Sequence, residues 1–195
     1  MGESDGVRRG SAAGDAGFTD LLGGRRVPKH APLIEAIGRL DEATSALGLA
    51  KSAAGEGRTR RLIHQTQHDL YEAMAELALP PGHPQARRLT ESHLAWLDRC
   101  VATVEAPFSA MTKFVLPGAC PASAPLDVAR ATVRGAERQL VRLAHEGEGD
   151  AVNPHTLAYL NRLSLLLYYL ARAEDAASGV DFDEAGAPAV RPEAE

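Results

Sequence analysis

Three arginines and one glutamate recur along one stretch of the chain at spacings that would gather their charged groups on one face of a helix. Arg130, Arg134, Glu137 and Arg138 stand at positions i, i+4, i+7 and i+8. An arginine fork matches phosphate oxygens bidentately, and a neighbouring glutamate can hold the forks or accept from a ligand hydroxyl. This cluster suits a small polyanion, although a solvated basic face is the plainer interpretation of the stretch taken alone.

A glycine-dense segment, residues 14–24, precedes three further cations, Arg25, Arg26 and Lys29. Glycines allow backbone N–H groups to approach phosphates closely. No Gly-Lys-Ser/Thr follows, so the segment is not a Walker loop. It is not a dinucleotide-binding fingerprint either. A flexible loop without a ligand is the alternative interpretation.

Two other polar features carry weaker predictions. His64 and His68 have metal-ligand spacing on a helix, but without a metalloprotease glutamate or an evident third ligand they are predicted to be structural or solvated. Asp41 stands at the border of an apolar stripe, where a carboxylate is costly unless it is paired. We therefore expect a cation opposite Asp41, with an exposed acid as the alternative.

Five amphipathic helices are predicted to position these residues. In the stretch that carries the arginines, apolar residues recur at three- and four-residue steps from Leu126 to Leu143. Asn153 and Pro154 form an N-cap and first-turn pair for the last helix. The predicted helices cover about residues 32–53, 59–79, 84–105, 126–140 and 153–176. Joined by loops, they predict an all-α fold, a five-helix bundle.

The composition limits the function. A net charge of −5 over 195 residues gives no reason to expect nucleic acid as a partner. Two cysteines, Cys100 and Cys120, are too few for a disulfide framework or a zinc site. No long uncharged apolar run or signal-peptide core is found. We therefore expect a cytoplasmic protein without a membrane segment.

Three parts are expected along the chain. Residues 1–30 read as a glycine-rich loop, residues 31–177 as the helical domain, and residues 178–195 as a disordered tail.

The stretch between the third and fourth helices is rich in apolar residues, and its Phe114 is a candidate wall of a ligand pocket.

Taken in order over about residues 11–174, these segments resemble the ATP:cob(I)alamin adenosyltransferases of the propanediol-utilisation type. Each motif alone is weak, but five in order at compatible spacings are specific. The matching segments are Gly14-Asp-x-Gly-x-Thr19 with Arg26-Val-Pro-Lys29, Gly38-x-x-Asp41-Glu42 with Gly48-Leu-Ala, Phe114-Val-Leu-Pro-Gly118, Ala129-Arg-x-x-x-Arg-x-Ala-Glu-Arg138, and Tyr159-Leu-Asn-Arg-Leu-Ser164.

The resemblance implies a homotrimer of five-helix bundles, with each active site in a cleft between neighbouring subunits. Asp41 would pair with Arg130 across that interface, and Phe114 would cover the lower face of the corrin. With Arg134, these are the implied catalytic residues. ATP, with Mg²⁺ bound mainly through it, would be held by Ser11, Gly14, Asp15, Gly17, Thr19, Asp20, Lys29, Arg134, Glu137, Arg138 and Asn161.

The implied reaction moves the 5′-deoxyadenosyl group of ATP to the cobalt of cob(I)alamin, giving adenosylcobalamin and triphosphate. Such a reaction removes no proton, so the protein has to align an in-line attack and stabilise the leaving triphosphate. A reductase and a B12-dependent mutase are the implied protein partners. Which corrinoid is preferred, and how many sites of a trimer fill, stay open.

The chain departs from the family pattern at several positions. Ala12 and Ala13 stand where a basic residue and a Thr or Asn are usual, Gly135 replaces an arginine, and Leu165 replaces an aspartate. Asp20 adds an acid to the ATP loop. The alternative function is therefore a catalytically weak carrier or sensor of the same fold that binds a corrinoid or a nucleotide.

Overall fold

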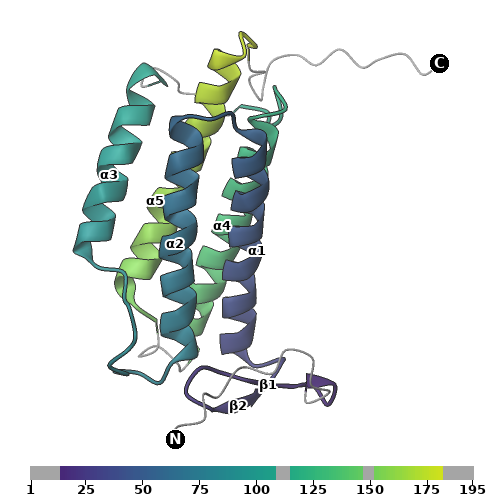
Figure 1. The fold of residues 1–195 in the computed structure, drawn as a ribbon, viewed down its shortest axis with the longest axis vertical. Coiled ribbons are helices and arrows are strands. Elements are labelled where there is room, and N and C mark those ends of the chain that lie inside the picture. The colour runs from purple at the N-terminus through teal and green to yellow at the C-terminus, as the bar shows by residue number, and fades with distance from the viewer. Residues whose placement is uncertain (1–13, 109–114, 147–151, 182–195) are drawn as a thin grey trace, which may run out of the picture.

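The computed structural model describes residues 14–108, 115–146 and 152–181. Five helices lie side by side along the long axis of the molecule, and a small hairpin lies at the end where the first helix begins (Figure 1). The helices are α1 (Pro32–Ala53), α2 (Arg58–Ala78), α3 (Glu91–Glu105), α4 (Ala124–His145) and α5 (Pro154–Ala177), and a short 3₁₀ turn, Ala106–Phe108, follows α3. The predicted five-helix fold is confirmed.

The core forms where the apolar stripes of the helices meet. The stripe predicted for α4 is fully enclosed: Leu126, Ala129, Val133, Ala136, Leu140 and Leu143 are all buried. This helix packs against α1 on one side and α5 on the other, while α3 packs chiefly on α5. Burial of apolar side chains contributes about 25 cal/mol for each Å² removed from water, so enclosing this stripe stabilises the fold.

Two helices begin with local signals that the sequence contains. Asn153 precedes Pro154, and its side-chain oxygen accepts a hydrogen bond from the backbone nitrogen of His155 at 3.0 Å. The third helix begins at Glu91, seven residues later than the predicted start near 84. Thr90 is its N-cap and forms a capping box with His93, so the chain before it remains a connection rather than a first turn.

The N-terminal described segment contains an antiparallel hairpin of strands β1 (Phe18–Asp20) and β2 (Arg26–Pro28), with Thr19 opposite Val27. The turn between the strands uses positive φ angles at Gly23 and Gly24, which favour glycine. This hairpin lies within the segment predicted to be loop, so that prediction missed it. Strands of three residues are too short to show an alternating pattern.

Both cysteines are free and buried. Among the described helices, none combines the length and the apolar character that a bilayer crossing requires.

Candidate functional site

The arginine face of α4, defined here as Arg130, Arg134, Glu137 and Arg138, lies on the outer side of the helix. Arg134 and Arg138 are exposed, and the other two side chains are half-buried. Asn161 reaches this face from α5, where its Nδ2 donates a hydrogen bond to Oε1 of Glu137 at 3.2 Å. Donors and cations from two neighbouring helices therefore share one surface, which suits the binding of an anion.

A second group of predicted site residues comes together beside the hairpin. The backbone nitrogen of Lys29 donates to the carbonyl of Gly17 at 2.8 Å, and that of Gly17 donates to Gly14 at 3.2 Å. The Lys29 ammonium lies so close to Gly14 that a Cβ there would be 3.3 Å from Nζ. Glycine thus allows the backbone to approach the cation closely, and we call Gly14, Gly17 and Lys29 the Lys29 cradle.

The remaining predicted residues of the hairpin region differ in exposure. Asp15 and Asp20 are exposed, and Thr19 is half-buried. Oδ1 of Asp20 lies 3.1 Å from Nη1 of Arg26, across the two strands. Two predicted residues, Ser11 and Phe114, lie outside the described residues.

Asp41 is exposed on α1 and forms no hydrogen bond or ion pair with another described residue of the chain. The cation that we expected opposite it is therefore not found within the described part of one chain. Arg130, the partner implied by the family resemblance, instead has its Nε 3.5 Å from Oδ1 of Asp127, one turn earlier on α4.

That contact belongs to a group of charged side chains that the sequence interpretation missed. Asp127 also accepts a hydrogen bond at Oδ2 from Nη2 of Arg172, at 2.9 Å, and Nε of Arg172 lies 2.9 Å from Oδ2 of Asp175. Asp127 is 4% exposed, and the Arg172 and Asp175 side chains are fully buried. We call Asp127, Arg130, Arg172 and Asp175 the buried ion cluster. The sequence signal for this cluster was the i, i+3 spacing of opposite charges on the inward faces of two helices, Asp127 with Arg130 and Arg172 with Asp175.

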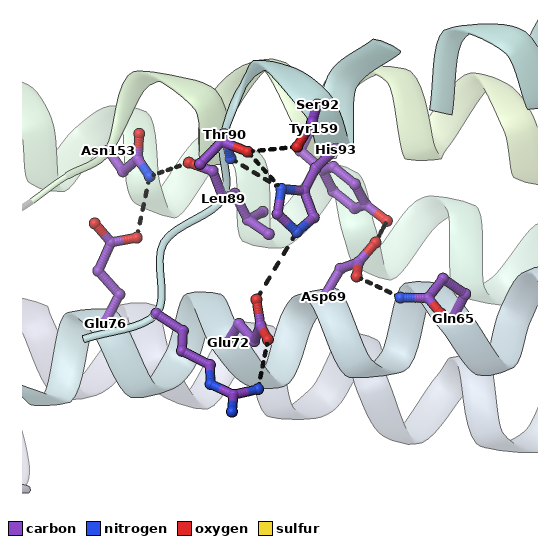
Figure 2. Close-up of polar contacts among 11 residues, drawn as sticks. Gln65, Asp69, Glu72, Glu76, Leu89, Thr90, Ser92, His93, Asn153 and Tyr159 are labelled. Atoms are coloured by element: carbon purple, nitrogen blue, oxygen red, sulfur yellow. Dashed lines mark hydrogen bonds and ion pairs between the residues drawn. The ribbon is translucent and has the colours of Figure 1, made fainter. Parts of the chain in front are cut away.

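Polar contacts also join α2 to α3 and α5 (Figure 2). The Tyr159 hydroxyl donates to Oδ2 of Asp69 at 2.5 Å, and Gln65 donates to Oδ1 at 2.9 Å. Farther along α2, Glu76 accepts from Nδ2 of Asn153 at 3.1 Å. Burial, together with the Asp69 carboxylate, raises the pKa of the Tyr159 hydroxyl well above its usual value. These side chains hold helices together and face no predicted site residue.

The histidines of α2 lie on its exposed side, where Nε2 of His64 is 3.3 Å from Nε2 of His68. Within the described ranges, no group of three or more His, Cys, Asp or Glu side chains could hold a metal ion. A hollow of 640 Å³ lies beside His68 and Tyr71, between α2, the hairpin turn and the α2–α3 connection. None of the predicted ATP- or corrinoid-binding residues lines this hollow.

No hydrogen bond or ion pair between described residues joins the Lys29 cradle to the arginine face within one chain. Each of the two groups offers phosphate-binding chemistry.

Comparisons with known proteins agree with this chemistry. Residues 11–174 match the family model described as cobalamin adenosyltransferase. The chain is 40% identical over 164 residues to the corrinoid adenosyltransferase PduO of Salmonella typhimurium, which covers 83% of this chain and 48% of that protein. The chain therefore spans about half the length of that relative. The cobalamin adenosyltransferase of Cupriavidus metallidurans is 39% identical over 168 residues, 85% of this chain and 87% of its own length.

Among solved structures, a variant PduO-type ATP:corrinoid adenosyltransferase from Lactobacillus reuteri, complexed with cobalamin and ATP, superimposes with a TM-score of 0.82 at 26% identity. The match covers 90% of this chain and 98% of that one. The family predicted from the five sequence motifs is confirmed. With its five-helix fold, its arginine face and a family match over most of its length, the chain belongs to the cobalamin adenosyltransferase family.

Proposed function

We propose that the protein transfers the 5′-deoxyadenosyl group of ATP to the cobalt of a reduced corrinoid, giving an adenosylated corrinoid and triphosphate. The observation that carries this proposal is the arginine face, where Asn161 of α5 is joined to Glu137 beside Arg134 and Arg138. The names of the relatives, corrinoid and cobalamin adenosyltransferases, point to the same reaction.

The residues suit a displacement in which the substrate supplies the nucleophile. Cob(I)alamin attacks C5′ of the ribose with an electron pair on cobalt, the C5′–O bond breaks, and triphosphate leaves with that bonding pair. The protein needs no base because no proton is removed. Its task is to align the reactants and to stabilise the negative charge of the leaving group. In our proposal, Arg134, Arg138 and Lys29 perform the second task.

We propose that Mg²⁺ enters with ATP. The described residues offer no group of three acidic or imidazole ligands, so the chain does not present a dedicated metal site there. Mg²⁺ keeps several waters and is usually held through substrate phosphates and one or two carboxylates. The ion would therefore be bound mostly by the triphosphate chain of the substrate.

A homotrimer with sites between subunits is the assembly that we propose. The Asp41 carboxylate supports it, since its cation partner is not found within the described part of one chain and a neighbouring chain could supply it. Asp41, exposed and unpaired among the described residues, would meet Arg130 of another chain. The helices that carry Asp41, Arg130 and Asn161 also expose large apolar side chains, which contact between chains would bury. These are Leu49 of α1, Val128 and Val141 of α4, and Leu165 of α5.

We further propose that Phe114, which lies outside the described residues, forms an apolar wall against the lower face of the corrin. A wall that displaces the lower axial ligand would make cobalt(II) easier to reduce. A reductase would then supply the reduced corrinoid, and a B12-dependent mutase would receive the product.

One observation favours the alternative function, a carrier or sensor with little activity. Asp20 pairs with Arg26 in the hairpin, so an added acid neutralises part of the positive charge expected to face ATP. Weaker attraction for the triphosphate would lower turnover more than it lowers corrinoid binding.

The deciding experiment is an anaerobic assay with purified protein, ATP, Mg²⁺ and chemically reduced cob(I)alamin. The change in corrinoid absorbance and the released triphosphate are both quantified. Adenosylated corrinoid and triphosphate in equal amounts support the enzyme. Saturable binding of corrinoid or ATP without product would replace it with the carrier.

A further inference from the structure

One buried carboxylate connects the arginine face with the protein interior. Oδ2 of Asp127 accepts from Arg172 at 2.9 Å, while Oδ1 of the same group lies 3.5 Å from Nε of Arg130. Of the four residues in the buried ion cluster, Asp127 contacts both arginines, whereas Asp175 is paired with Arg172. Arg130 is therefore in contact with a carboxylate that is almost completely buried.

Electrostatics explains why this contact should be persistent. The cluster contains two arginines and two aspartates, whose formal charges cancel. A buried charge without a partner is strongly unfavourable, so each member of the cluster stabilises the positions of the others. Asp127 cannot turn toward solvent without leaving Arg172 with less negative charge beside it.

Arg130 spans the boundary between the cluster and the arginine face. Its Nε is buried, with no hydrogen bond from the described part of the chain, whereas 31% of its side chain is exposed. The Asp127 carboxylate, 3.5 Å from this nitrogen, attracts it by its opposite charge. Fixing the inner end of a long side chain reduces the conformational entropy that is lost when its outer end binds.

We propose that Asp127 is a positioning residue, which orients Arg130 toward the site between subunits. This inference rests on the proposed function only for the role of Arg130; the contact itself can be tested without it. The competing explanation is that Asp127 merely neutralises Arg172.

Asp175 supplies a matched control for that competing explanation. Asp127→Asn and Asp175→Asn each preserve side-chain size, and each changes the formal charge of the cluster from zero to +1. Both variants weaken the surroundings of Arg172, but only the first removes the carboxylate beside Arg130. Loss of stability alone should therefore be common to both variants.

The first readout is the Nε–Hε resonance of Arg130 in ¹⁵N-arginine-labelled protein, assigned with Arg130→Lys. Asp127→Asn should accelerate exchange of this proton with water by about tenfold, because it removes the carboxylate charge that attracts the buried N–H. Asp175→Asn should leave the exchange rate within about twofold. Equal acceleration in both variants would overturn the proposal.

A second comparison covers the case in which Asp127→Asn fails to fold. Arg172→Met with Asp175→Asn replaces the inner pair by uncharged groups, which proteins often tolerate, and leaves Asp127 beside Arg130. Adding Asp127→Asn to this background removes only the contact in question. An unchanged exchange rate of the Arg130 proton after that addition would contradict the positioning role.

Kinetics then separates this inference from the proposed function. In the wild-type background Asp127→Asn should lower kcat/KM for adenosyl transfer by about tenfold, and in an Arg130→Lys background by less than about twofold, because the two residues act as one unit. Equal losses in both backgrounds would reject the coupling. If the wild-type protein shows no transfer, the proposed function fails, while proton exchange still decides whether Asp127 positions Arg130.

Discussion

Asn161 of α5 donates a hydrogen bond to Glu137 of α4 across 3.2 Å, and this contact defines where two helices meet at the arginine face. Neither Arg134 nor Arg138, both exposed, forms an ion pair with another described residue, so both guanidinium groups are available for a ligand beside this contact.

Arg134→Ala should remove most of the transferase activity without unfolding the protein. The side chain is exposed, so its removal leaves no cavity. Loss of one preorganised donor to a leaving anion typically lowers turnover by about a hundredfold or more. The assay is anaerobic turnover, with circular dichroism as the control for the fold. Unchanged turnover would show that this face does not bind the triphosphate.

Asp41→Asn should weaken subunit association and lower activity in parallel. The carboxylate is exposed in a single chain, so its effect should come from contacts between chains. Sedimentation velocity over a dilution series measures association, and Glu42→Gln, which removes a neighbouring exposed acid, is the matched control. A fully active variant with unaltered association would exclude the proposed pairing with Arg130.

Tyr159→Phe should destabilise the protein by about 1–3 kcal/mol, because Asp69 stays buried after losing a donor (Figure 2). The measurement is urea unfolding. The pKa of the Tyr159 hydroxyl is raised in the folded state, so its contribution should be constant below about pH 10, where the unfolded tyrosine begins to ionise, and should fall above it. A difference between wild type and variant that shrinks on acidification to pH 7 would disagree.

Gly135→Ala should stabilise the chain by about 0.5–1 kcal/mol, since glycine is costly inside a helix. A Cβ built at this position meets no atom within 4 Å, so the single chain has room for it. Thermal unfolding of wild type and variant measures the change in stability. Transferase activity of the same samples tests whether the arginine face next to Gly135 is affected. A stable variant that no longer assembles would show that the glycine serves an approach between chains.

The sequence predicted the helices because their apolar stripes are long and regular, and the stripe from Leu126 to Leu143 is buried as expected. The start of α3 was placed too early, near residue 84, because the prediction did not use the capping signal of Thr90, after which the helix begins in the structure. The hairpin was missed because its strands, of three residues each, are too short to show an alternating pattern.

The candidate site was only partly accessible from the sequence. The spacing of Arg134, Glu137 and Arg138 predicted a shared face, and the family resemblance named Asn161, which the structure places in contact with Glu137. The link from Asp127 to Arg172 was missed, since it joins residues 45 positions apart and both look like flank residues in a helical pattern. Pairings of this kind depend on how two helices pack, which periodicity alone does not determine.

The packing of α3 chiefly on α5 has a consequence for the way in which the molecule opens. A helix held mainly by one neighbour can detach while α1, α2, α4 and α5 stay folded, so backbone amides of Glu91–Glu105 should exchange hydrogen for deuterium sooner than those of α4. Local opening would then begin at α3, while α4, which carries the arginine face, stays folded.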